Sequence, residues 1–179
     1  MPEPLKILVI SLAGIGDTLL ATPLIHELRL NHPEARIEAL VMWAGSRDIL
    51  AGNPHLDAVH HFQMLKEGPW RSFRYLASLR RQHYGVTLNT YPQSRKEYRL
   101  IARLLGAPVR ASHRYENRSW LDRWLVNREL EQSYERHSVD QNLGLLGLLG
   151  DRLRLETHAT ELFLSPAEEA WAREYRERA

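Results

Sequence analysis

The chain has no cysteine among its 179 residues. This absence excludes a disulfide scaffold, a zinc ribbon, an iron–sulfur centre and a thiol nucleophile. The sequence also lacks the run of about 20 apolar residues that a transmembrane helix needs, because charged residues interrupt its longest apolar stretch, residues 5–25. Pro2, Glu3 and Pro4 stand where a signal peptide would carry basic residues. We therefore expect a soluble, cytoplasmic protein without a targeting segment.

Lysine is scarce, because only three of the 24 basic residues are lysine and the other 21 are arginine. Nine basic residues lie between Lys66 and Arg103, where only two acidic residues accompany them. One interpretation of this segment is a set of solvated helix faces. The other is a surface that meets an anionic ligand or the anionic leaflet of a membrane. Arginine suits such anions because its guanidinium group binds phosphate and carboxylate through two hydrogen bonds.

Short apolar runs alternate with helical patterns along the first two thirds of the chain. Strands are predicted at residues 6–11, 36–42, 56–62, 84–89 and 109–112, and the helices between them include residues 46–51, 70–81 and 94–105. Strands that alternate with helices of this length form a parallel sheet with helices on both faces. The pattern predicts an α/β fold, a Rossmann-like, doubly wound and mainly parallel sheet.

The last third is less regular. Residues 137–149 read as a helix and residues 162–164 as a last short strand, while Trp120 and Trp124 have the spacing of core residues on one helix face, with contact to lipid or sugar as the alternative. Ser165 to Glu168 has the form of a capping box, which predicts a helix from there to Ala179. We expect a domain over residues 1–164, and the start of a linker helix over 165–179 that continues beyond this chain.

A loop with two glycines, Gly14 and Gly16, follows the first predicted strand. It is not the dinucleotide-binding fingerprint, because Leu19 occupies the position of the third glycine. Asp17 comes directly after this loop, and a carboxylate there is suited either to take a proton from a substrate hydroxyl or to cap a helix. Pro23 leaves open whether the helix starts at Thr22 or starts near Asp17 and bends.

Residues 14–25, with the sequence Gly-Ile-Gly-Asp-Thr-Leu-Leu-Ala-Thr-Pro-Leu-Ile, resemble the N-terminal signature of glycosyltransferase family nine, the ADP-heptose:lipopolysaccharide heptosyltransferases. The resemblance continues at residues 32–37, 53–59, 79–86 and 137–143. It implies the GT-B fold, in which two Rossmann-like domains face a cleft. This chain resembles the N-terminal, acceptor-binding half of that fold.

The resemblance also implies the chemistry. Family members transfer heptose from ADP-heptose to the lipopolysaccharide inner core with inversion and without a metal, so no metal site is expected here. Asp17 matches the aspartate that acts as the base. The sugar-nucleotide donor is expected on a C-terminal domain absent from this chain, so this chain alone binds no cofactor and transfers no sugar.

The implied acceptor is a lipid-linked core oligosaccharide that carries phosphates and carboxylates, so peripheral contact with the cytoplasmic face of the inner membrane is expected. The residues predicted to bind the acceptor follow the first, fourth and fifth strands: Gly14, Gly16, Thr18, Ser94, Arg95, Lys96, His113 and Arg114. An alternative function is a non-catalytic module that binds an anionic glycan or nucleotide. Nucleic-acid binding is not expected, because the basic segment lacks the aromatic interleaving of RNA-recognition surfaces.

Overall fold

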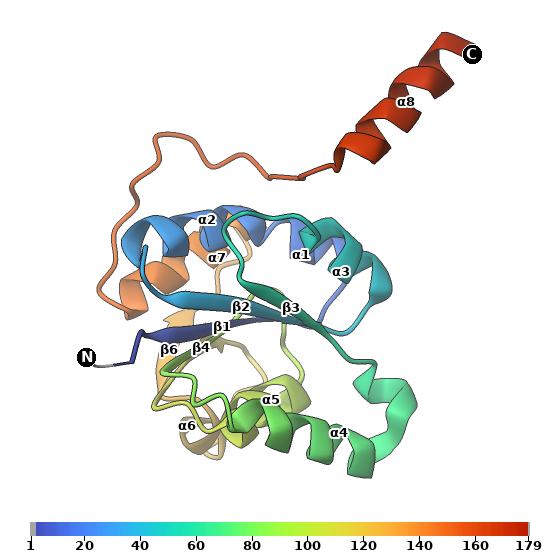
Figure 1. Cartoon of the computed structure of the whole chain (residues 1–179). Helices are drawn as coiled ribbons and strands as arrows, with labels where there is room; N and C mark the ends of the chain where they lie inside the picture. Colours follow the sequence, from blue (N-terminus) through green and yellow to red (C-terminus); the bar gives the residue numbers. More distant parts are fainter. Residues whose placement is uncertain (1–2, 179) are drawn as a thin grey trace.

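The computed structural model describes residues 3–178, and they form an α/β fold built on one six-stranded sheet (Figure 1). The strands are β1 (Lys6–Ser11), β2 (Arg36–Val41), β3 (Ala58–His61), β4 (Val86–Asn89), β5 (Val109–Arg114) and β6 (Arg128–Glu131). The helices are α1 (Ile15–Leu19), α2 (Thr22–Asn31), α3 (Ala44–Leu50), α4 (Met64–Arg80), α5 (Lys96–Leu105), α6 (Asp122–Leu125), α7 (Ser138–Gly144), the 3-10 helix η1 (Leu145–Leu148) and α8 (Pro166–Arg178).

The sheet has the strand order β3-β2-β1-β4-β5-β6, and every neighbouring pair is parallel. This is the order of the Rossmann fold, in which the chain starts in the middle and winds outward in both directions. β1 lies at the centre, so residues 7–10 are fully buried on both faces of the sheet. A continuous apolar run is the sequence expected of such a strand. The predicted fold class is confirmed.

Helices cover both faces of the sheet (Figure 1). One core packs α2, α7 and η1 against the sheet and contains Leu24, Ile25 and Leu28 of α2. The other packs α4 and α5 against the opposite face. It contains Leu76 and Leu79 of α4 and Ile101, Ala102 and Leu105 of α5. The chain therefore has the three layers that a parallel sheet requires to bury its two apolar faces.

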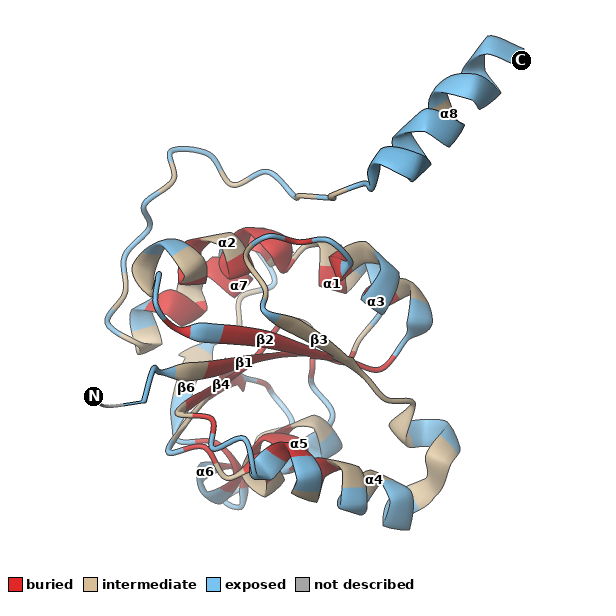
Figure 2. Ribbon diagram, viewed as in Figure 1, coloured by how far each residue is buried: buried red, intermediate tan, exposed pale blue. Residues whose placement is uncertain are grey.

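A connecting segment, residues 150–164, runs without helix or strand from η1 to α8. It lies along α2 in Figure 1, and Figure 2 shows that α8 beyond it is exposed along its length. Its polar contacts with α2 are numerous. Asp151 Oδ2 lies 2.7 Å from Nε2 of His32, the residue that directly follows α2. The backbone N–H groups of Arg154 and Leu155 donate to the carboxylate of Glu27 in α2.

Several local predictions need correction. Residues 162–164 form no strand and belong to the connecting segment, whereas the sixth strand is β6, which was not predicted. Trp120 and Trp124 are not core residues, since they are 82% and 60% exposed. The predicted helix at the end of the chain is confirmed as α8, with its capping box between Ser165 and Glu168. Ala179 and residues 1–2 lie outside the described residues.

Candidate functional site

The predicted site residues all belong to one edge of the sheet. Because the six strands are parallel, the loops that leave their carboxyl ends meet at the same edge, where ligands bind in open α/β folds. Gly14 to Thr18 follow β1, Ser94 to Lys96 follow β4, and His113 and Arg114 end β5. β1, β4 and β5 are neighbours in the sheet, so these three groups lie side by side.

Asp17 lies on α1, a short helix of its own. Its Oδ2 accepts a hydrogen bond of 2.8 Å from the backbone N–H of Gly14, the residue that precedes the helix. Asp17 is half-buried, and its Oδ1 makes no hydrogen bond with any described residue. α2 then starts at Thr22 with Pro23 as its second residue, so the proline begins a second helix and does not bend the first. Asp17 thus has one oxygen engaged and one available.

Gly14 and Gly16 are exposed in this loop. A Cβ atom on Gly14 would lie 3.3 Å from Asp17 Oδ2, whereas a Cβ on Gly16 would have no atom within 4 Å. The neighbouring Ile15 side chain packs on α3, where Gly45 leaves room for it. The space beside Gly16 is therefore open on the side of the loop that faces away from the described chain.

Thr18 is fully buried beneath the loop. Its hydroxyl lies 3.0 Å from the hydroxyls of Ser11 and Ser46 and donates to the carbonyl of Gly14 at 3.1 Å. These bonds tie α1 to the end of β1 and to α3. Thr18 therefore positions the glycine loop, and its side chain does not reach the surface where an acceptor would bind.

Ser94, Arg95 and Lys96 are exposed at the start of α5, with Arg95 as the residue that precedes the helix. No ion pair among the described residues includes Arg95 or Lys96. The Ser94 carbonyl accepts a bond of 2.8 Å from the Asn117 side chain, which links this turn to the loop after β5. The two basic groups therefore point to solvent from a fixed turn.

His113 and Arg114 are adjacent but have different environments. His113 is fully buried, its Nε2 lies 3.0 Å from the carbonyl of Gln141, and burial lowers its pKa to about 4. It is therefore neutral at pH 7, and it lies below the surface of the site. Arg114 is exposed and forms an ion pair with Glu131 across the ends of β5 and β6.

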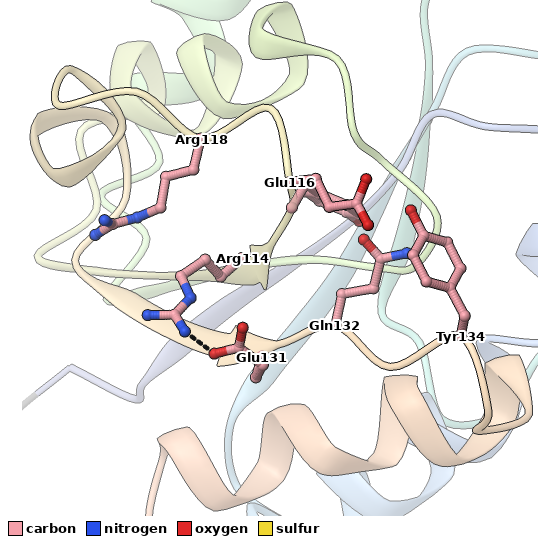
Figure 3. Close-up of a pocket in the computed structure, with 7 residues that line it drawn as sticks. Arg114, Glu116, Arg118, Glu131, Gln132 and Tyr134 are labelled. Atoms are coloured by element: carbon pink, nitrogen blue, oxygen red, sulfur yellow. Dashed lines mark hydrogen bonds and ion pairs between the residues drawn. The ribbon is translucent and has the colours of Figure 1, made fainter.

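A pocket opens at this edge between the ends of β4, β5 and β6. It consists of two adjoining hollows of about 360 and 370 Å³. Residues that line both are Tyr115, Glu116, Gln132 and Tyr134. Arg114 and Arg118 line one hollow and Ser94 the other. Figure 3 shows the charged and amide groups of the first hollow, with the Arg114–Glu131 ion pair drawn as a dashed line.

The wall of this pocket is held by buried polar contacts. Arg99 Nε donates to Asp122 Oδ1 at 2.9 Å, and both side chains are almost fully buried. Gln93 N–H donates to the Tyr115 hydroxyl at 2.7 Å, and burial raises the pKa of that hydroxyl, so it stays protonated. Arg99 belongs to the basic segment singled out in the sequence, yet it braces the site and does not face a ligand.

Most residues that line the pocket were not predicted. Gln132 and Tyr134 follow β6, a short and exposed edge strand whose pattern did not reveal it. Tyr115 and Glu116 follow β5 directly, and polar or aromatic residues immediately after a predicted parallel strand would have been a usable signal. The pocket combines guanidinium groups that are paired with glutamates with further carboxylate, amide and phenol groups, so it is suited to a hydroxylated, polar ligand.

One cluster elsewhere has the composition of a metal site. Ligand atoms of His26, His55 and Glu161 lie within 4.8 Å of one another. The two imidazole rings stack in parallel with centroids 3.8 Å apart, so their lone pairs do not converge on one point. His26 Nδ1 is instead 2.7 Å from Glu161, which lies in the connecting segment. The cluster attaches that segment to α2, and the absence of a metal site remains a prediction.

The chain is 28% identical over 169 residues to lipopolysaccharide heptosyltransferase 3 of Escherichia coli K12, a match that covers 90% of this chain and 46% of that protein. A second Escherichia coli protein of the same name is 32% identical over 107 residues, which cover 58% of this chain and 31% of that protein. No family model matches the chain.

Two solved structures share the fold. A glycosyl transferase family 9 protein from Veillonella parvula superposes with a TM-score of 0.75 at 20% identity, over 97% of this chain and 49% of that structure. The Escherichia coli heptosyltransferase WaaC with ADP superposes with a TM-score of 0.69 at 16% identity, over 87% of this chain and 50% of that structure. This chain is a distant homologue of the lipopolysaccharide heptosyltransferases of glycosyltransferase family 9.

The predicted resemblance is confirmed, and so is the expectation that the fold corresponds to half of a GT-B enzyme. This heptosyltransferase-like domain spans less than half the length of the curated relatives that it matches. Within residues 3–178 it has no helix that is both long and apolar enough to cross a membrane.

Proposed function

We propose that this chain is the acceptor-binding and base-supplying half of an inverting, metal-independent glycosyltransferase that moves heptose from ADP-heptose to the lipopolysaccharide inner core. One observation carries the proposal. Asp17 has an available carboxylate oxygen at the same sheet edge as a pocket lined by Arg114 and Arg118. The names of the curated relatives, which are lipopolysaccharide heptosyltransferases, support the reaction class.

The pocket fits an anionic, hydroxyl-rich acceptor. Arg118 is held by Glu129 through bonds of 2.8–3.1 Å, and Arg114 by Glu131, so both guanidinium groups are fixed in direction. Arg95 and Lys96 add two exposed charges at the rim, from the turn that also carries Ser94. Phosphates and carboxylates on core sugars would bind these cations, while tyrosine and glutamine side chains bind hydroxyls.

Asp17 would take the proton in the transfer step. An acceptor hydroxyl oxygen attacks the anomeric carbon of the heptose from the side opposite to the diphosphate, a new C–O bond forms, and the bond to the departing ADP breaks. The proton of the attacking hydroxyl passes to the Asp17 carboxylate, which acts as a general base. The hydrogen bond from Gly14 N–H holds that carboxylate in place.

The donor would bind to a second half of the enzyme, outside these 179 residues. WaaC carries ADP in its solved structure, and this chain covers half of that structure. In line with the family resemblance of residues 14–25, we propose that ADP-heptose binds to the other half and the acceptor to this one, at the cytoplasmic face of the inner membrane. Residues 1–179 alone would then bind acceptor without transferring sugar, because transfer needs both reactants held together.

Acceptor binding tests this assignment. De-acylated core oligosaccharide, which has no lipid, is titrated calorimetrically into residues 1–179. We expect the double variant R95E/K96E to weaken binding at least tenfold, since two attractions become repulsions. The matched control is Arg128→Glu, which reverses an exposed charge at the amino end of β6, the opposite edge of the sheet.

Unchanged affinity in R95E/K96E, or an equal loss in the Arg128 control, would remove the acceptor assignment for α5. Binding of the oligosaccharide with no transfer, even when the donor-binding half is present, would favour the alternative function. The chain would then be a non-catalytic module for anionic glycans or nucleotides.

A further inference from the structure

Large apolar side chains project from the helix layer formed by α4, α5 and α6. We call this surface the α4–α6 face and define it by the exposed side chains of Leu65, Trp70, Phe73, Leu100, Trp124 and Trp120, the last of which lies in the turn before α6. Exposed fractions reach 69% for Trp70 and 82% for Trp120. Three of the five tryptophans of the chain belong to this face. A group of exposed aromatic and aliphatic side chains on one layer marks an interaction surface.

Basic residues accompany these apolar groups. On α4, Lys66, Arg71 and Arg74 are exposed, and the acid among them, Glu67, is paired with Arg71. On α6 the exposed Arg123 lies beside Trp124 in the sequence, and the Trp124 ring packs 4.5 Å from the guanidinium carbon of Arg103. The face is therefore both apolar and strongly positive.

The helix α4 shows why the apolar groups point outward. Leu76 and Leu79 face the sheet core, and Trp70 and Arg74 lie on the opposite side of the helix at a spacing of one turn. The Trp70 and Phe73 rings stack with centroids 6.2 Å apart. Gly68 breaks α4 with a positive φ of 79°. The turn before this break therefore has its own direction, and its Leu65 side chain is also exposed.

We propose that the α4–α6 face docks the protein on the interface of an anionic lipid bilayer. The proposal rests on the proposed function in one respect, because a lipid-linked acceptor lies in such a surface. Tryptophan and phenylalanine rings settle at the level of the lipid headgroups, with arginines beside them bound to the headgroup phosphates. The docking is peripheral, since the helices of this face stay packed on the sheet.

The positive charge of the α4–α6 face favours an anionic bilayer over other partners. A second copy of the chain would bring two positive surfaces together, which repel each other. A nucleic acid would match the charge and stack on the aromatic rings, but it would leave the exposed side chains of Leu65 and Leu100 without an apolar partner. A bilayer interface provides anionic headgroups and an apolar interior at once.

The position of the face agrees with the candidate site. The first turn of α4 follows the carboxyl end of β3, and β3 is separated from β1 by one strand. At about 4.8 Å per strand, this turn leaves the sheet roughly 10 Å from the strand that leads to Asp17. α5 begins at the same edge, with Arg95 and Lys96. A bilayer at this face would therefore present its headgroups next to the pocket.

Vesicle binding tests the proposal with residues 1–179 and no sugar acceptor present. Co-sedimentation with vesicles of phosphatidylglycerol and phosphatidylethanolamine should be at least tenfold stronger than with phosphatidylcholine vesicles, and should weaken between 50 and 500 mM KCl. The variant W70S/W124S should lose at least tenfold in affinity. The variant K66Q/R74Q removes two exposed cations that form no ion pair with any described residue, and it should lose about fivefold for each side chain.

The matched control is W171S/Y175S, which removes an exposed and stacked aromatic pair from α8. The proposal would be overturned if the control lost as much affinity as W70S/W124S, or if the protein bound both kinds of vesicle equally. Binding of single-stranded oligonucleotide without binding of vesicles would also overturn it. Thermal melts of each variant verify folding. Because the vesicles contain no acceptor and the oligosaccharide titration contains no lipid, either proposal can fail while the other stands. Asp17→Asn should bind vesicles like the wild type.

Discussion

At the scale of single residues, the geometry of Asp17 is compatible with both tasks that the sequence presented as alternatives, the helix cap and the proposed role of base. Its Oδ2 accepts the Gly14 N–H and so caps α1 in the manner of a capping box, although Gly14, not Asp17, is the residue that precedes the helix. Its Oδ1 has no bond with any described residue. The capping bond and the proposed proton transfer use different oxygens, so they do not compete.

Asparagine at position 17 separates these tasks, because its carbonyl oxygen can still accept from Gly14 while it cannot take a proton. In an enzyme form that contains both halves, we expect Asp17→Asn to lower kcat for heptose transfer by about 10²–10⁴-fold. The melting temperature should stay close to that of the wild type. Asp17→Ala should show the same kinetic loss and, in addition, about 1 kcal/mol lower stability, since the cap is also removed.

The measurements are single-turnover transfer and thermal unfolding of both variants. Transfer by Asp17→Asn at the wild-type rate would contradict the role as base. A melting temperature so low that unfolding explains the lost activity would favour a purely structural role for the carboxylate.

At the scale of elements, Glu27 is the main attachment point between α2 and the connecting segment. Its buried carboxylate accepts the N–H groups of Arg154 at 2.9–3.0 Å and of Leu155 at 2.8 Å, and His158 Nε2 lies 3.0 Å away. Burial alone would raise the pKa of Glu27, but these hydrogen bonds outweigh it and lower the pKa below its usual value. The ionised carboxylate therefore belongs to the attached state.

We expect Glu27→Gln to release the connecting segment, because one acceptor oxygen becomes an NH₂ group that faces backbone N–H donors. Loss of buried, charge-assisted bonds should cost about 2–3 kcal/mol. Hydrogen exchange should become faster at the amides of Arg154 and Leu155, with little change in β1. The control is Glu34→Gln at an exposed position, and equal exchange in both variants would contradict the attachment.

Local patterns predicted the strands that are made mainly of buried apolar residues, such as β1 and β2. They failed for β6, an edge strand with the sequence Arg-Glu-Leu-Glu and two exposed residues, because nothing in its pattern distinguishes it from a loop. They also gave a strand at residues 162–164. The segment there is held by partners more than a hundred residues earlier, because Glu161 N–H donates to the Thr22 hydroxyl at 2.9 Å and Phe163 packs edge-on against His55.

In the candidate site, too, the sequence predicted the features that depend on local patterns and missed those that depend on long-range packing. The sheet edge and the loop around Asp17 could be predicted because the alternation of strands with helices and the spacing of glycines are local signals. The buried positions of Thr18 and His113 could not, since they depend on how α3 and α7 pack over the loops. Arg99 resembled a surface charge in the sequence, and its buried partner Asp122 lies 23 residues away.

At the scale of the whole molecule, closure of the two helix layers over the sheet buries titratable groups on both faces. On one face, Glu38 of β2 is almost fully buried beside His60, Tyr84 and Arg36. Burial would raise its pKa, but the hydrogen bonds from these three side chains lower it to about 2. This carboxylate stabilises the fold above its unfolded pKa, near 4.5, and the contribution is lost as the pH falls toward 2.

His113 has an earlier effect as the pH falls. In the unfolded chain it takes up a proton near pH 6.5, whereas in the fold it remains neutral down to about pH 4 because of its burial. Between these values the unfolded state binds more protons, so stability falls as the pH falls. The difference corresponds to roughly 3 kcal/mol between pH 6.5 and 4.

We therefore expect urea unfolding of the wild type to lose roughly 3 kcal/mol more between pH 7 and pH 4 than unfolding of His113→Gln, whose amide cannot titrate. The control is His83→Asn at an exposed position, where the positive φ of 56° suits asparagine. Its pH dependence should follow that of the wild type. If His113→Gln loses as much unfolding free energy as the wild type between pH 7 and pH 4, His113 takes up its proton in the folded protein over this range. The layer of α7 over β5 would then be open to water at that position.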